Sequence, residues 1–147
     1  MADLDDLPSM KEDTKKKKST GAKGFPATPR LSDLNLEWGM ANRLSRIIKP
    51  ESGRTVMLAV DHGYFQGPTT GLEELDKTVG PLLPYADALM PTRGGLRYNV
   101  SPGASTPIVL RVSGGNSMLG ELSDEDITVS MEDALRINAS AVAISVY

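Results

Sequence analysis

The sequence predicts an α/β fold built on a parallel β-sheet. Apolar runs at 56–60, 107–112 and 141–147, with a weaker one at 86–90, are typical of buried strands. Helical segments separate these runs, as expected for parallel strands, which are buried on both faces and need crossover helices. Four strands fit either a small open sheet or half of an eight-stranded barrel. Because the last strand is apolar and would leave an uncovered sheet edge, we expect an incomplete barrel.

Two helices are expected in the first half of the chain. The first covers about 34–48, and Pro50 follows it directly; its Trp38 and Met40 are expected to pack. The second covers about 72–82, where apolar residues recur at helical spacing until Pro81. These helices would connect and cover the strands.

A third helix is expected to begin near Ser130. This serine and Asp133, three residues later, resemble a capping box. The side chains expected to face inward are Met131, Ala134, Leu135 and Ile137. In contrast, segments 62–71 and 91–106 are rich in glycine and proline and are predicted to be loops.

Composition limits the possible functions. The chain has 147 residues with 39% apolar composition, which allows one core of ordinary size. It has no cysteine and a single histidine, so disulfides, thiolate zinc sites and multi-histidine metal sites are excluded. We therefore expect no metal and no prosthetic group.

Residues 1–31 are predicted to form a disordered tail, and residues 32–147 the partial barrel domain. The lysine run 15–18 has no interleaved aromatic residues, so it is a weak nucleic-acid signal. No apolar stretch approaches the roughly 20 residues that span a bilayer, and the acidic N-terminus lacks the apolar core of a signal peptide. We expect a cytoplasmic protein with neither a nucleic-acid nor a membrane partner.

The stretch VMLAVDHGYF places Asp61 and His62 at the tip of the first strand. In α/β enzymes this is where reactive groups lie. Asp61 could orient a substrate carbonyl or move protons, and His62 is suited to proton transfer near pH 7. The alternative is that both side chains only cap the following turn. Tyr64 and Phe65 are expected to pack at the rim rather than bind substrate.

Three further polar residues are candidates for substrate binding. Arg111 interrupts an apolar run, and a buried arginine requires a partner. It could hold a phosphate or enolate oxygen, or could instead form an ion pair that only supports Asp61. Arg93 also follows a strand, and Ser113, with the Gly-Gly pair after it, could offer backbone N–H groups to an anion.

Several segments resemble the class I aldolase family, which holds archaeal-type fructose-bisphosphate aldolases and the thiolases that break down phosphorylated autoinducer-2. The matching segments are LEWGMANRLSRIIKPESGRTVMLAVDHGYFQGPTTGLE, LMPTRGGLR, VLRVSGGNS and ELSDEDITVSMEDALRINASAVAISVY. The strand ending in DHG is similar across the family, whereas DHGYFQGPTTGLE resembles the thiolase branch. The resemblance implies the N-terminal half of a (β/α)8 TIM barrel, preceded by an extra helix.

The resemblance also implies an activity. A member of the thiolase branch would cleave 3-hydroxy-5-phosphonooxypentane-2,4-dione with coenzyme A as co-substrate, giving dihydroxyacetone phosphate and acetyl-CoA. By the same resemblance, His62 would help to pass the acetyl group to coenzyme A. Family members use a Schiff-base lysine, to which no residue here can be matched: Lys77 lies in a predicted helix and Lys49 follows one. No residue is assigned to coenzyme A binding.

Two alternatives remain open, and the family resemblance adds an expectation about assembly. The DHG strand alone would fit a retro-aldol lyase acting on a sugar phosphate. A different class of function is a non-catalytic, truncated half-barrel that self-associates through its exposed sheet edges. The full-length form would be a ring-shaped homo-oligomer, as in known family members.

Overall fold

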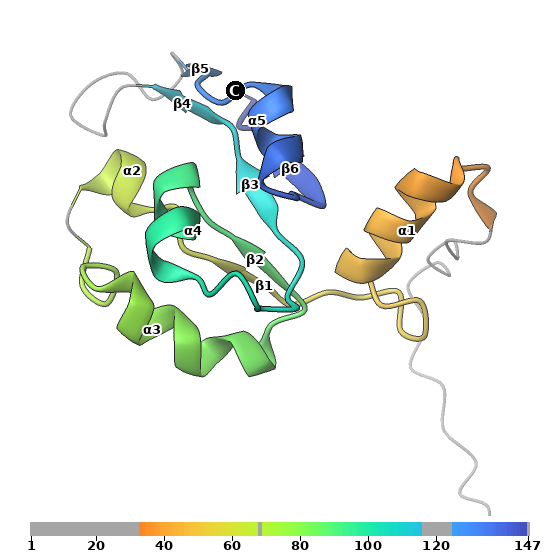
Figure 1. Cartoon of the computed structure of the whole chain (residues 1–147), viewed down its shortest axis with the longest axis horizontal. Coiled ribbons are helices and arrows are strands. Elements are labelled where there is room, and N and C mark those ends of the chain that lie inside the picture. Colours follow the sequence, from red (N-terminus) through yellow and green to blue (C-terminus); the bar gives the residue numbers. More distant parts are fainter. Residues whose placement is uncertain (1–32, 68, 116–124, 147) are drawn as a thin grey trace, which may run out of the picture.

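Four parallel strands form the centre of the molecule. The computed structural model describes residues 33–67, 69–115 and 125–146. The strands are β1 (Met57–Ala59), β2 (Ala88–Met90), β3 (Val109–Arg111) and β6 (Ala141–Ala143) (Figure 1). Parallel pairing joins β1 to β2 and β3 to β6, and a parallel bridge between Leu89 and Ile108 links β2 to β3. The spatial order therefore follows the chain, as in part of a barrel.

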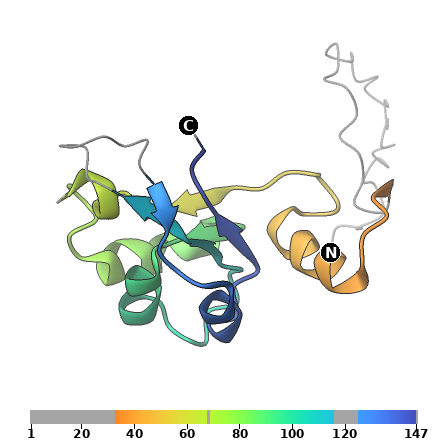
Figure 2. The same cartoon turned by 90° about the horizontal axis from the view of Figure 1, so that it is seen from above.

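Some of the helices cover one side of these strands. The elements are α1 (Trp38–Ile47), α2 (Gly63–Gln66), α3 (Leu75–Leu82), a 3₁₀ turn η2 (Leu83–Tyr85), α4 (Arg93–Asn99) and α5 (Met131–Arg136). Figure 2 shows α3, α4 and α5 on the same side of the strands. None of the helices in the described ranges is long and apolar enough to cross a membrane.

The core on the helical side follows the two-residue period of the strands. Val60 and Leu89 pack with Val79 of α3, while Leu110 and Val112 pack with Ala134 of α5. All six side chains are buried. This core fixes the strands and so determines where their carboxyl ends lie.

The other side of the strands carries the alternate residues. Ala88 and Val109, near the starts of β2 and β3, are buried against Ile47 at the end of α1. Met90, Ala141 and Ala143 pack against the same cluster. These are small or apolar side chains, and polar side chains replace them only toward the carboxyl ends of the strands.

The four predicted strands are confirmed, with their ends within four residues of the predicted ones, but both predicted loops contain helices. Segment 91–106 includes α4, because the Thr92 side chain caps it by accepting a hydrogen bond from the Gly95 N–H (3.1 Å). Segment 62–71 includes the short helix α2. The prediction also missed the antiparallel pair β4 (Ser113–Gly115) and β5 (Glu125–Ile127).

The predicted capping box of α5 is confirmed in its main feature, because the Ser130 hydroxyl accepts a hydrogen bond from the Asp133 N–H (3.2 Å). Some packing predictions were wrong. The side chains of Trp38, Met40, Met131 and Leu135 are exposed. The helices present them away from the strands, since only Ile47 of α1 and Ala134 of α5 are buried. The predicted tail, residues 1–31, lies outside the described residues.

Candidate functional site

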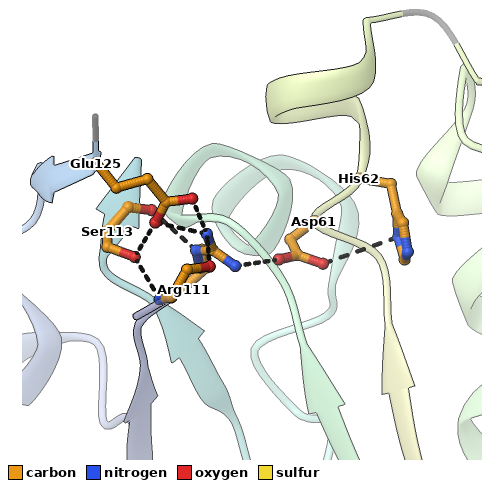
Figure 3. A network of polar contacts seen from close by, with 6 residues as sticks. Asp61, His62, Arg111, Ser113 and Glu125 are labelled. Atoms are coloured by element: carbon orange, nitrogen blue, oxygen red, sulfur yellow. Dashed lines mark hydrogen bonds and ion pairs between the residues drawn. The ribbon is translucent and has the colours of Figure 1, made fainter. Parts of the chain in front are cut away.

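A polar network lies at the carboxyl ends of β1, β3 and β6 (Figure 3). Arg111 is the last residue of β3, and Asp61 follows β1 by two residues. Ser113 opens β4, Glu125 opens β5, and Ser145 follows β6. These five residues, here called the Arg111 network, come from segments up to 84 positions apart in the sequence. The strand alternation places Arg111 on the face of Val109, opposite the helices.

The Arg111 guanidinium is the centre of the network. Nη2 donates to both carboxylate oxygens of Glu125 (2.6 and 2.8 Å) and to the Ser145 hydroxyl (2.7 Å). Nη1 donates to Asp61 Oδ2 (3.3 Å), and Nε donates to the Ser113 carbonyl (2.9 Å). The side chain is 11% exposed. Of the two sequence-based alternatives, the ion pair with Asp61 is therefore present.

Glu125 is a partner that sequence reasoning missed. It accepts hydrogen bonds from the Ser113 hydroxyl (2.6 Å) and from Arg111. The Ser113 hydrogen bond is the main cause that lowers the pKa of Glu125 below its ordinary value, assisted by the charge and hydrogen bond of Arg111 and opposed by burial. Glu125 lies in the acidic sequence SDED. Such a sequence does not show which of its carboxylates is buried in the folded protein.

Asp61 is the most buried charged group of the site, with 3% exposure. Its carboxylate contacts Arg111, and its backbone carbonyl accepts the Tyr64 N–H (3.0 Å) that begins α2. Neither Asp61 nor His62 caps this turn with its side chain, since the N-cap position of α2 has no side-chain cap hydrogen bond. The capping alternative therefore does not account for these two residues.

The His62 ring lies beside Asp61 with one nitrogen unsatisfied. Nδ1 is buried and has no hydrogen-bond partner in the described structure, and Asp61 Oδ1 at 3.8 Å is beyond hydrogen-bond range. The side chain as a whole is 41% exposed. Its ring contacts Phe65 (centroids 6.0 Å apart), which also lies 5.9 Å from the Arg111 guanidinium. Phe65 therefore packs between the histidine and the network.

Tyr64 and Gly114 are in close contact. A Cβ added to Gly114 would meet three Tyr64 atoms at 2.2 to 2.4 Å, so the Tyr64 ring occupies the space that a side chain at this position would need. Gly114 and Gly115 pair with Asp126 and Glu125 in the antiparallel β4–β5 ladder. These glycines thus bring α2 against β4, next to the Arg111 network.

A cavity of about 330 Å³ reaches Asp61 from the side of α2, α3 and α4. Tyr64, Thr92, Tyr98 and Asn99 contribute polar groups to its lining, and Leu72 and Leu75 contribute apolar ones. Its volume is within the range of small-molecule sites. Asp61 is the one member of the Arg111 network that also lines this cavity.

Arg93 is not brought into the network. It is the first residue of α4, and its guanidinium pairs with Asp133 of α5. The two lysines of the described ranges are also elsewhere: Lys49 pairs with Asp87 (3.7 Å) and Lys77 with Glu74. Among the described residues, no group of three or more His, Cys, Asp or Glu could hold a metal ion.

Comparisons with known proteins agree on one family. No family model matches the chain. A 3-hydroxy-5-phosphonooxypentane-2,4-dione thiolase from Enterobacter sp. (strain 638) is 55% identical, with 100% of this chain and 48% of the relative covered. The thiolase of the same name from Escherichia coli (strain K12) is 52% identical, with 100% of this chain and 49% of the relative covered.

Solved structures support the same fold. A Schiff base forming fructose-1,6-bisphosphate aldolase matches with a TM-score of 0.53 and 24% identity, over 70% of this chain and 42% of that protein. An archaeal fructose 1,6-bisphosphate aldolase gives a TM-score of 0.52 over the same shares. The resemblance predicted from the sequence is confirmed: the chain is a relative of 3-hydroxy-5-phosphonooxypentane-2,4-dione thiolases and spans about half the length of the curated relatives it matches.

Proposed function

We propose that this chain forms the first half of an aldolase-type barrel with the thiolase activity of its relatives. The substrate would be 3-hydroxy-5-phosphonooxypentane-2,4-dione, and coenzyme A would take the acetyl group, leaving dihydroxyacetone phosphate. The observation that carries the proposal is the 55% identity to such a thiolase over the whole of this chain. The site geometry supports it, because polar groups meet at the carboxyl ends of parallel strands, where barrel enzymes bind substrate.

The proposed reaction breaks the bond between C2 and C3 of the dione. The coenzyme A sulfur bonds to C2 of the acetyl group and loses its proton, and C3 gains a proton, so atoms and charge balance. His62 is proposed to accept the thiol proton and deliver it to C3, since its buried Nδ1 has no protein partner among the described residues. Asp61 would orient the substrate from the end of β1, fixed by Arg111.

Arg111 is proposed to act through Asp61 and Glu125 as much as on substrate. Its guanidinium already binds two carboxylates and one hydroxyl, which makes it a positioning residue for the site. Arg93 remains a proposed phosphate ligand, at the start of α4. For Ser113, the hydroxyl donates to Glu125, so its contribution would be to hold that carboxylate.

Coenzyme A dependence tests the reaction class. In a longer form that completes the barrel, formation of acetyl-CoA from the dione, lost in His62→Ala and unchanged in Lys77→Ala, would support the acyl transfer. The Lys77 ammonium pairs with Glu74 on α3 and serves as a matched exposed control. Release of dihydroxyacetone phosphate at the same rate without coenzyme A would instead favour a retro-aldol lyase.

The Schiff-base step needs a lysine that the described network does not contain. We propose that borohydride with the ketone substrate traps no adduct on this chain by itself, and that this chain alone is inactive. A longer form carrying a lysine on a later strand would be trapped. Trapping on Lys49 or Lys77 would refute this part of the proposal.

A specific observation favours the second candidate, a non-catalytic half-barrel that associates. At the two outer strands of the described sheet, apolar side chains are exposed: Val56 and Met57 at β1, and Val142, Ile144 and Val146 at β6. Such edges promote pairing with another chain. Sedimentation at low concentration tests this candidate, and a compact monomer would argue against it. A ring-shaped homo-oligomer of the longer form is the corresponding proposal for the thiolase.

A further inference from the structure

A second cavity, of about 400 Å³, lies at the other end of β3 from the Arg111 network. Its lining includes Pro107 and Ile108, which directly precede β3, and residues at the ends of α1, α4 and α5. It shares no lining residue with the cavity that reaches Asp61. The proposed thiolase reaction makes no use of it.

Three arginines from three helices line this cavity: Arg46 of α1, Arg97 of α4 and Arg136 of α5. Among the described residues, no aspartate or glutamate lines it, although the whole chain has a net charge of −3. Ser101 and Thr106 add hydroxyl groups, and Asn138 adds an amide. This cavity, here called the arginine cavity, is therefore a concentration of positive charge and donors on an acidic protein.

A simpler account is that these arginines only stabilise helix ends. Each lies in the last turn of its helix, where a cation interacts favourably with the helix dipole. That account does not explain why all three surround one cavity. Arg97 has a carboxylate near it, Asp133 at 3.6 Å, but Arg46 and Arg136 form no ion pair with any described residue. Their guanidinium groups are thus available to an anion.

The floor of the arginine cavity is apolar. Leu96, Ile108 and Ile137 line it while packing against the buried cluster that contains Leu110. A floor attached to the core is rigid, which favours binding of a flat apolar group. The volume exceeds that needed for a bare phosphate and fits a small organic ligand.

We propose that the arginine cavity binds a small phosphate ester carrying a flat or apolar group, such as a nucleoside monophosphate. The guanidinium groups of Arg46 and Arg136 would hold the phosphate, with the Asn138 amide as a further donor. The apolar part would lie on Leu96, Ile108 and Ile137. Because the cavity is separate from Asp61 and Arg111, its occupant is not the proposed substrate of the thiolase site.

Calorimetric titration of the full chain with AMP, adenosine and inorganic phosphate tests the proposal. We expect AMP to bind more tightly than phosphate, no heat from adenosine, and weakening by added salt. Arg136→Gln and Arg46→Gln should each weaken AMP about tenfold, the effect of losing one charged hydrogen bond. The matched control is Arg43→Gln, one turn earlier on α1 and outside the cavity lining.

Three results would overturn the proposal: no binding of AMP at millimolar concentration, equal weakening in Arg43→Gln, or binding of adenosine as tight as that of AMP. Lower thermal stability of Arg46→Gln and Arg136→Gln without any AMP binding would show that the arginines serve only the helix ends. If a variant fails to fold, NMR of the wild-type chain with added AMP tests the proposal instead. AMP should then shift the Asn138 side-chain amide and leave that of Asn42, on α1 outside the lining, in place.

Discussion

The two ends of β3 use arginine in opposite ways. Arg111 at the carboxyl end is 11% exposed and bound to two carboxylates within the protein. Arg46 and Arg136 line the arginine cavity at the amino end, are exposed, and form no ion pair with a described residue. A buried charge must have its partners built in, because the cost of removing it from water is not otherwise offset. An exposed charge keeps its hydration and can exchange it for a ligand.

This difference means that mutation should affect stability at one end and ligand binding at the other. The largest effect is expected for Arg111→Met, which leaves Asp61 and Glu125 buried without a counter-charge. Unfolding in urea should show a loss of about 3–5 kcal/mol. Arg46→Met, with the same change in the exposed setting, should lose less than about 1 kcal/mol. Similar losses of stability in the two variants would contradict this difference between the two ends of β3.

Glu125→Gln tests the carboxyl end of β3 through the pH dependence of stability. The folded-state pKa of Glu125 is lowered, so its contribution to stability is present above the ordinary value of 4.5 and is lost as pH falls through the lowered pKa. At pH 7 the variant should be less stable by about 2 kcal/mol, the size of a charged hydrogen bond. The difference from wild type should shrink steadily below pH 4.5.

The control for this pH series is Glu132→Gln, on the exposed first turn of α5. Its side chain is exposed, so the substitution should change stability at pH 7 by less than about 0.5 kcal/mol. A Glu125→Gln curve parallel to wild type down to pH 3 would mean that this carboxylate is not held by Ser113 and Arg111.

Gly114→Ala examines how closely the carboxyl end is packed. The new methyl group would lie within 2.4 Å of the Tyr64 ring, so the ring must move away from β4. Overpacking of this kind costs about 1–2 kcal/mol. The same substitution in a Tyr64→Ala background should cost little, and Gly63→Ala, where nothing lies within 4 Å, should be nearly neutral. Equal costs with and without Tyr64 would show that the ring is not the obstacle.

Sequence reasoning found the parts of the site that local patterns encode. Asp61 follows an apolar strand and Arg111 interrupts one, so both were predictable, as was the need of Arg111 for a partner. Glu125 was not, because it reaches Arg111 only through the antiparallel pairing of β4 and β5. That pairing depends on tertiary structure, and no periodic pattern in the sequence of residues 113–127 predicts it.

The same limit applies to α4 and to the arginine cavity. Two glycines and a later proline predicted a loop at 91–106, yet the Thr92 cap and packing of Leu96 against the core sustain a helix. Propensity is a weak guide when tertiary packing opposes it. Arg97 and Arg136 are 39 positions apart in the sequence, and Arg46 and Arg136 are 90 apart. Only the fold brings these three arginines together.

The smallest effect on stability is expected for Asp133→Asn. This substitution removes an ion pair and also changes the charge beside the arginine cavity. Asp133 forms ion pairs with Arg93 and Arg97 on α4, and all three side chains are partly exposed. Exposed pairs of this kind contribute about 0.5 kcal/mol, so stability should fall only slightly. The substitution also removes a carboxylate that pairs with Arg97 of the arginine cavity. AMP affinity should therefore rise about two- to threefold, because Coulomb repulsion of the phosphate is relieved. Titration of Asp133→Asn beside Asp126→Asn, an acidic residue on β5 outside the cavity, separates this local effect from net charge. An unchanged affinity in Asp133→Asn would mean that Arg97 does not face the bound phosphate, leaving Arg46 and Arg136 as its ligands.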